Sequence, residues 1–478
     1  MAPTAPIGLA WALLPLLVLV GCFITGAVTL GLSTEILIVS MLLAATVAGW
    51  VALRQGASWD DIQRSTGEKV SAVLPVILIL LAIGMLIGTW VLAGTIPLLV
   101  SWGIQLINPQ FFVVTAFLVT AVMSICTGTS WGSAGTLGVA LMGAAAALEV
   151  PLAATAGAVV SGAYFGDKMS PLSDSTNICA LGAGAGLYDH IRHMLYTAVP
   201  SFGLALVVYS LAAPGGGDLG DALPQAAERL LADIDTVFRP GAWSLLPLLL
   251  VLGGVIWRRP PALVLAASSI VAMVVGVAVQ GFGVDQAISA AVAGFDPRMA
   301  STLGHDPAAF SELFNRLVGR GGLYSMANTL IVIISAFLLA AGLDVSGALD
   351  RILRALLSGV RSIFGLVGAT MAAGATMISL TSHGGVTALI VGGMFQDAYR
   401  ERGLAPENLS RSLEDSVTIV EPLLPWTVSA IFMATTLGVP TVEYLPWAVF
   451  CFGGPVFSLG WALASGATRV GIRRLPAE

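Results

Sequence analysis

One stretch of 79 residues, from Val70 to Leu148, contains no aspartate, glutamate, lysine or arginine. A helix that crosses a bilayer needs about 20 mainly apolar residues, so this run alone could supply about three spans. Of the 478 residues in the chain, 57% are hydrophobic and only 10% are charged, whereas soluble domains carry about 25% charged residues. These features exclude a soluble protein and predict an all-α polytopic membrane protein with roughly ten to twelve spans.

Apolar runs and loops divide the chain into four predicted parts. They are an N-terminal transmembrane hairpin (1–70), a first repeat (71–214), an external loop with a linking span (215–260) and a second repeat (261–478). Between Gly215 and Pro240 five acidic residues accompany two arginines, whereas several other short loops are basic. Because cytoplasmic loops are enriched in lysine and arginine, we expect this loop outside and both termini in the cytoplasm.

The two halves share a polar interruption of their apolar runs. "GTSWGSAGTLGVALMG" (128–143) and "LTSHGGVTALIVGGMF" (380–395) both read Thr-Ser-aromatic-Gly, which aligns Trp131 with His383. Each is followed by a charged segment rich in hydroxyls. Paired interruptions of this kind indicate the midplane site of a transporter. The alternative is chance similarity between segments whose small residues only pack membrane helices closely.

The segment "GAYFGDKMSPLSDSTN" (162–177) places Asp167, Lys168 and Asp174 beside apolar runs. A charge at the centre of a membrane helix costs about 2.5–3.5 kcal/mol, so three charges need partners or water. We expect "GDKMSP" to interrupt a helix, because Pro171 lacks an amide hydrogen, and Lys168 to be the partial counter-charge of Asp167. Carbonyl, hydroxyl and carboxylate oxygens suit a hard cation such as sodium. The alternative is a cytoplasmic loop in water.

Three residues of the second half are further candidates. His383 lies in an apolar stretch and either carries a proton, hydrogen-bonds a polar substrate, or makes a structural hydrogen bond between helices. Glu421 has no cationic neighbour in sequence, so its carboxyl group should either keep a proton or meet a cation. Asp415 either binds an ion or only marks a loop boundary. The candidate ion- or substrate-binding residues are Thr129, Ser130, Asp167, Asp174, Ser175, Thr176, Asn177, Thr381, Ser382, His383, Asp415 and Glu421, with sodium expected at Asp167, Asp174, Thr129 and Ser130.

Several function classes lack their signatures. The sequence contains no HExxH or GxxxxGK[ST] motif, which argues against an enzyme and against ATP-driven pumping. The net charge of −6 is spread thinly, with no basic block for nucleic acid. We therefore expect no cofactor other than sodium as coupling ion or cargo, and the lipid bilayer as surroundings.

The same segments resemble the NhaC family of sodium/proton antiporters. The matching stretches are "TGTSWGSAGTLGVALMG", "AGAVVSGAYFGDKMSPLSDSTN", "HIRHMLYTAVP", "LSRSLEDSVTIVEPLLPW" and "TTLGVPTVEYLPWAVF". The resemblance implies two inverted-topology repeats, each with a re-entrant hairpin and a broken transmembrane helix. It also implies secondary, potential-driven sodium/proton exchange in the cytoplasmic membrane of a prokaryote. A homodimer is compatible with the family, although the sequence shows no interface.

One departure from the family pattern concerns the cargo. After the second Thr-Ser the family commonly shows a polar Asn/Asp-Gln-Tyr stretch, whereas this chain reads His383-Gly384-Gly385. Relatives of the family exchange malate for lactate or carry amino acids. The main prediction is therefore sodium/proton exchange. The alternative is a sodium- or proton-coupled carrier or exchanger of a small organic solute, either a dicarboxylate with lactate or an amino acid.

Overall fold

A computed structural model describes residues 7–31, 34–212, 223–357, 360, 362–465 and 470–475. Within these residues all named elements are helices and no strand occurs. Eight helices are long and apolar enough to cross a membrane, and the number rises to eleven if each of three bent helix pairs is one span. The predicted all-α polytopic membrane protein is thus confirmed. Residues 215–222 of the predicted external loop lie outside the described part.

The helices fall into three groups. The long apolar spans, with the short turns that extend them, are α1 (Leu9–Leu30), α2 (Thr34–Arg54), α4 (Leu74–Leu92), η1 (Pro109–Phe111) with α6 (Phe112–Thr127), α11 (Leu187–Leu211), α14 (Pro261–Val275) with η4 (Gly276–Gln280), η7 (Leu323–Met326) with α17 (Ala327–Val345), and α19 (Ile363–Thr381). The bent pairs join α12 (Gln225–Val237) to η3 (Ala242–Leu245) and α13 (Leu246–Ile256), α21 (Pro406–Leu413), η8 (Glu414–Thr418) and η9 (Glu421–Leu423) to α22 (Val428–Leu437), and α23 (Thr441–Tyr444) and η10 (Leu445–Trp447) to α24 (Val449–Ala464). The remaining elements are α3 (Trp59–Ala72), α5 (Thr95–Leu106), α7 (Ser130–Ser133), η2 (Ala134–Gly138), α8 (Val139–Ala147), α9 (Leu152–Met169), α10 (Asp174–Ala183), α15 (Val284–Val292), η5 (Pro297–Leu303), η6 (Pro307–Ala309), α16 (Glu312–Val318), α18 (Ala348–Leu357) and α20 (Gly384–Arg400).

Glycines bring the helices around the two interruptions close together. A Cβ atom on Gly162 of α9 would lie 2.4 Å from the Phe117 carbonyl oxygen of α6. A Cβ atom on Gly392 of α20 would lie 2.3 Å from the Gly182 carbonyl oxygen of α10. A methyl group would not fit at either position. Membrane helices pack tightly where small residues allow their backbones to approach. These contacts fix α9 on α6 and α10 on α20.

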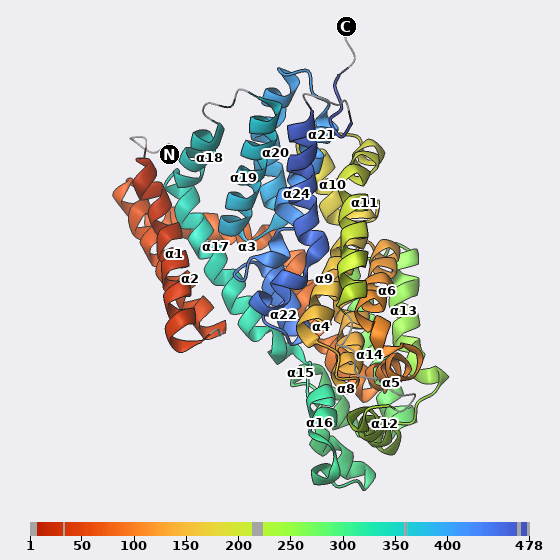
Figure 1. The fold of residues 1–478 in the computed structure, drawn as a ribbon. Helices are drawn as coiled ribbons and strands as arrows, with labels where there is room; N and C mark the ends of the chain where they lie inside the picture. The colour runs from red at the N-terminus through yellow and green to blue at the C-terminus, as the bar shows by residue number, and fades with distance from the viewer. Residues whose placement is uncertain are drawn as a thin grey trace.

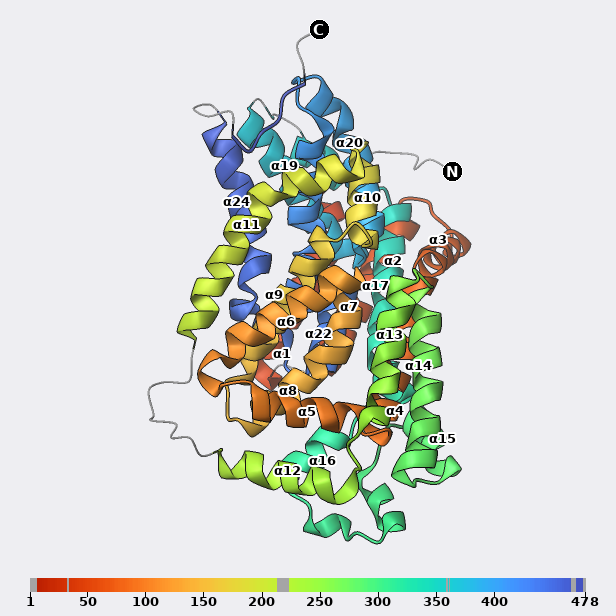
Figure 2. The same cartoon turned by 90° about the vertical axis from the view of Figure 1, so that its right-hand side faces the viewer.

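Two helical hairpins enter the molecule from opposite ends (Figures 1 and 2). In both views α6 and the α7–η2–α8 run occupy the half of the molecule that holds α5, whereas α19 and α20 occupy the other half. The tip of the first hairpin is Thr127–Thr129 and the tip of the second is Thr381–His383. Each half therefore contains the interrupted hairpin that its sequence predicts. The inverted topology of the two halves as a whole remains a prediction.

The two tips have the same local structure. In the first, Gly128 is left-handed at φ 67°, and the Thr129 side chain caps α7. In the second, Ser382 takes this conformation at φ 54°, and the His383 side chain caps α20. Thus His383 corresponds to Thr129. The predicted alignment of Trp131 with His383 is wrong by two positions. The Thr-Ser pair lies at the start of a helix in the first tip, whereas it lies at the end of a helix in the second.

The second interruption in each half follows a carboxylate. Helix α9 continues through Asp167 to Met169, and the chain is irregular from Ser170 until α10 begins at Asp174. The predicted interruption at "GDKMSP" is therefore present but begins after the charged pair. In the second half, η9 begins at Glu421 and the axis bends by 44° before α22. Both helix breaks thus lie close to an acidic side chain.

Candidate ion-binding site

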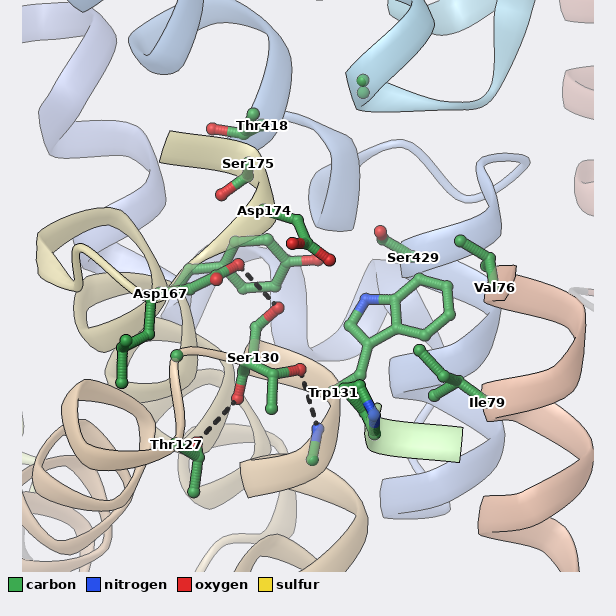
Figure 3. Close-up of a pocket in the computed structure, with 18 of the residues that line it drawn as sticks. Val76, Ile79, Thr127, Ser130, Trp131, Asp167, Asp174, Ser175, Thr418 and Ser429 are labelled. Atoms are coloured by element: carbon green, nitrogen blue, oxygen red, sulfur yellow. Dashed lines mark hydrogen bonds between the residues drawn. The ribbon is translucent and has the colours of Figure 1, made fainter. Parts of the chain in front are cut away.

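The hairpin tips and helix breaks of the two halves enclose one cavity of about 470 Å³ (Figure 3). Its wall is formed mainly by α4, α6, α7, the α9–α10 break, the turn between α13 and α14, the α19–α20 tip, η8, η9 and α22. Seven of the predicted site residues line it, namely Thr129, Ser130, Asp167, Asp174, Ser175, His383 and Glu421. Residues as far apart in sequence as Val76 and Ser429 therefore meet at one place.

Asp167 is held by hydroxyl groups at two helix starts. Its Oδ2 accepts a hydrogen bond from Ser130 Oγ at 3.0 Å, and its Oδ1 accepts one from Ser173 Oγ at 2.6 Å. Ser130 is the first residue of α7, and Ser173 is the cap of α10. Helix N-termini carry partial positive charge, so both starts stabilise a negative carboxylate between them.

Glu421 occupies the corresponding place in the second half. Its side chain is 8% exposed and lies close to the Gly384 backbone and to Ser429. Gly384 is so close that a Cβ atom on it would lie 2.8 Å from Glu421 Oε2. Because Gly384 begins α20 and Ser429 lies in the first turn of α22, this carboxylate also faces two helix starts. Each half therefore contributes one acid held by one hairpin and one helix break.

Neither acid has a cationic side chain as its partner. The ion pairs among the described residues include neither Asp167 nor Glu421. An ionised carboxylate away from bulk water is costly unless a cation or a proton compensates it. The cavity supplies further oxygen atoms from Thr129, Ser175 and Ser429, and such donors suit sodium. The residues present therefore fit a site that sodium and protons can share.

Lys168 does not neutralise Asp167, contrary to the sequence-based prediction. It pairs instead with Asp415, and both side chains are fully buried. Thr197 Oγ1 of α11 lies 3.3 Å from both Lys168 Nζ and Asp415 Oδ1. Successive residues of an α-helix point about 100° apart, so Asp167 faces the cavity while Lys168 faces α11 and η8. Asp415 is therefore neither a loop boundary nor a residue of the cavity wall.

Four other predicted residues support the site from behind. Thr176 Oγ1 donates to the carbonyl oxygens of Asp167 and Lys168, each at 3.1 Å, and ties α10 to the end of α9. Asn177 Nδ2 donates to the Pro171 carbonyl at 3.1 Å. Thr381 and Ser382 form the second hairpin tip, where the Thr381 hydroxyl bonds that of Thr387. These side chains shape the interruptions and do not line the cavity.

The sequence interpretation missed several residues around the cavity. Tyr164, Thr418 and Ser429 line it, and Glu414 lies behind Thr418. Tyr164 precedes Asp167 by three positions on α9, a spacing that places both on one face of a helix. That spacing was a usable signal, whereas nothing in the local sequence around Ser429 points to Glu421.

Comparison with known proteins decides the family. A sequence model described as "Na+/H+ antiporter family" matches residues 5–209 and 162–465. The chain belongs to the Na+/H+ antiporter family. This antiporter is 44% identical over 435 residues to an uncharacterized Na+/H+ antiporter of Haemophilus influenzae, with 91% of each chain covered. It is 34% identical over 449 residues to the Na+/H+ antiporter NhaC of Alkalihalophilus pseudofirmus, with 94% of each chain covered.

A third relative of this antiporter bears a different name. The malate-2H+/Na+-lactate antiporter of Bacillus subtilis is 30% identical over 428 residues, which cover 88% of this chain and 87% of the relative. The predicted membership of the NhaC family is confirmed, and the antiporter is a multi-pass transporter of a family that is not an enzyme family.

Proposed function

We propose that this antiporter exchanges sodium for protons at the cavity between Asp167 and Glu421. The observation that carries the proposal is the Asp167 carboxylate, which two serine hydroxyls hold at two helix starts without a cationic partner. Family membership and the NhaC relatives agree with this cargo.

The chain's residues would exchange the two ions by competition. When Asp167 is ionised, its oxygens and the neighbouring hydroxyl oxygens offer sodium a negative, oxygen-rich place. When Asp167 is protonated, it is neutral and holds sodium weakly. Two positive charges within a few ångströms repel each other strongly outside bulk water, so one excludes the other. Exchange then requires only that the cavity open alternately to the two sides.

A second function is favoured by the size of the cavity. Its volume of about 470 Å³ lies within the roughly 300–1,000 Å³ range of small-molecule sites and exceeds what a bare ion needs. Arg258 and Arg259 also line it and could attract a carboxylate solute. The relative named as a malate-2H+/Na+-lactate antiporter agrees with this alternative. The second candidate is therefore sodium- or proton-coupled exchange of a small organic anion.

Purified protein in liposomes with an internal pH dye tests both functions. Sodium, lithium, potassium, malate, lactate and arginine are added separately outside, and the internal pH is recorded. We expect sodium to drive proton movement in the absence of any organic solute, because the site needs no organic solute to compensate the charge of Asp167. If sodium alone moves no protons and an organic anion is required, sodium/proton exchange is excluded and the second candidate replaces it.

We also propose that the antiporter lies in the cytoplasmic membrane with both termini inside. The acidic helix α12 lies at the end of the molecule opposite to α18 and to the end of α20 (Figures 1 and 2). Helix α18 carries Arg351 and Arg354, and short basic segments favour the cytoplasmic side.

Cysteine labelling checks this orientation. In a variant whose four native cysteines are serine, Glu228→Cys on α12 and Arg351→Cys on α18 are exposed positions at opposite ends. An impermeant thiol reagent added to intact cells should label Glu228→Cys and should label Arg351→Cys only after lysis. Labelling of Arg351→Cys in intact cells would reverse the proposed orientation.

A further inference from the structure

A second group of buried ionisable residues lies behind the cavity. His190 of α11 faces Glu414 of η8, with 3.8 Å between His190 Nε2 and Glu414 Oε2, and both side chains are at most 1% exposed. Neither ring nitrogen of His190 has a hydrogen-bond partner among the described residues, and neither does Glu414 Oε2. The separation is too long for a hydrogen bond. Two buried groups of complementary chemistry therefore face each other unsatisfied.

A proton on His190 would remove this mismatch. A buried polar group without a partner costs about 1–3 kcal/mol, and more if it is charged. Protonated imidazole is a cation with two donors, and Glu414 offers it a free carboxylate oxygen. Glu414 also belongs to a π-helical turn, a rare widening of the helix that is frequent at functional sites. The local geometry thus suits a charged pair better than two neutral groups.

The pair is linked to the ion-binding cavity. Glu414 Oε1 accepts a hydrogen bond from Thr418 Oγ1 at 2.7 Å, and Thr418 lines the cavity. On the other side, Asp189 precedes His190 and pairs with Arg473 at 3.5 Å, with both side chains about half exposed. His190 therefore lies between the cavity and water near the start of α11.

The buried charges around the two helix breaks do not balance. The carboxylates are Asp167, which is partly buried, and Glu414, Asp415 and Glu421, which are buried, and the cations are Lys168 and Arg411; the buried Glu407 is left out of this count because it pairs with Arg473. Four acids against two cations leave two negative charges that sodium or protons must compensate. Without sodium, two protons are needed to balance these charges, one at Asp167 and a second at another group.

Other ionisable groups surround His190 and Glu414. From the elements packed against them these are Asp167 and Lys168 of α9, Cys179 of α10, His193 of α11, Glu407 and Arg411 of α21, Asp415 of η8, Cys451 of α24 and Arg473 near the C-terminus. His193 lies one turn beyond His190, is buried, and lies near Arg411 and Asn408. Among the described residues His193 forms no ion pair with a carboxylate. It is therefore a matched control for the substitution of His190.

We infer that His190 and Glu414 form a second proton-binding site, which is occupied when sodium is absent from Asp167 and loses its proton when sodium binds. The inference rests on the proposed sodium/proton exchange and deepens it. A sodium ion at Asp167 and a proton on His190 are both attracted by the same acidic side chains and repel each other. Sodium binding at Asp167 therefore weakens proton binding at His190. A proton leaves this pair for each sodium that arrives, in addition to the competition at Asp167 itself.

Proton release upon sodium binding tests the inference without transport. Purified protein in weakly buffered detergent solution receives sodium chloride, with choline chloride as the ionic-strength control, while a dye reports released protons and calorimetry reports sodium binding. We expect His190→Gln and Glu414→Gln to bind sodium and to release about half as many protons as the parent. The control His193→Gln should release as many as the parent. Parental release from folded His190→Gln would overturn the inference.

Nuclear magnetic resonance of the unsubstituted protein keeps the test independent of folding defects. The chain has four histidines, so ¹⁵N-labelled imidazoles are assigned by comparison with His193→Gln, His305→Gln and His383→Gln variants. Sodium should shift the His190 signal from the protonated towards the neutral form and leave His193 unchanged. A His190 signal that ignores sodium overturns the inference. Failure of the proposed function looks different, because Asp167→Asn would then still bind sodium.

Discussion

Asp167→Asn is expected to abolish sodium-coupled proton movement in liposomes. The amide keeps the shape of the side chain and can still bond Ser130 and Ser173, but it neither titrates nor carries the charge that attracts sodium. A contact with a charged group is worth roughly 1.5–3 kcal/mol, so sodium binding should weaken about 10- to 100-fold. Proton flux driven by a sodium gradient should fall to the level of protein-free liposomes.

The matched control is the same substitution at a surface carboxylate. Asp397 of α20 is 82% exposed, pairs with Arg400 at 3.4 Å and does not line the cavity. Asp397→Asn should exchange sodium for protons like the parent, and melting curves should confirm that both variants fold. If folded Asp167→Asn still exchanges, Asp167 is not where sodium and protons compete, and Glu421 becomes the residue to replace next.

Lys168→Gln is expected to cause the largest loss of stability. It leaves Asp415 ionised and fully buried without its counter-charge. Removal of one member of a buried ion pair costs about 3–5 kcal/mol, whereas removal of both charges is often close to neutral. The single variant should therefore unfold at a markedly lower temperature in detergent, and Lys168→Gln combined with Asp415→Asn should recover most of the loss.

A double-mutant cycle of these two positions measures the coupling directly. The pairing in the structure predicts strong coupling between positions 168 and 415, and additive effects when Lys168→Gln is combined with Asp167→Asn. Strong coupling between positions 168 and 167, with none between 168 and 415, would show that Lys168 pairs with Asp167 and not with Asp415. Thermal unfolding of the parent, the three single variants and the two double variants is sufficient.

The fold class could be predicted from sequence because the bilayer permits few solutions. A charge-free run of 79 residues has no soluble alternative, and a polar interruption of such a run must be buried in protein or face water. The acids at 167 and 421 could be found for the same reason. Each is an ionisable side chain beside an apolar stretch, and such a residue is functional more often than structural.

The partner of Lys168 could not be predicted, because it depends on where α9 ends and which way its last turn points. Adjacent letters suggest a pair, yet neighbouring side chains on a helix diverge, and Asp415 lies 247 positions away. The register of the repeat failed for a related reason. The Thr-Ser letters recur, but the shared feature is a side chain that caps a helix, and threonine and histidine both serve this purpose.

The helix starts around the cavity have a consequence for the charge of the cargo. Four runs, capped by Thr129, Ser173, His383 and Thr427, begin at this one place. Without its two acids, such a scaffold would attract anions, since each start contributes about half a positive charge. We therefore propose that Asp167 and Glu421 impose selectivity for cations on a backbone that by itself favours anions. We therefore expect that replacing these two acids would let the same backbone favour carboxylate solutes over inorganic cations, without a new fold.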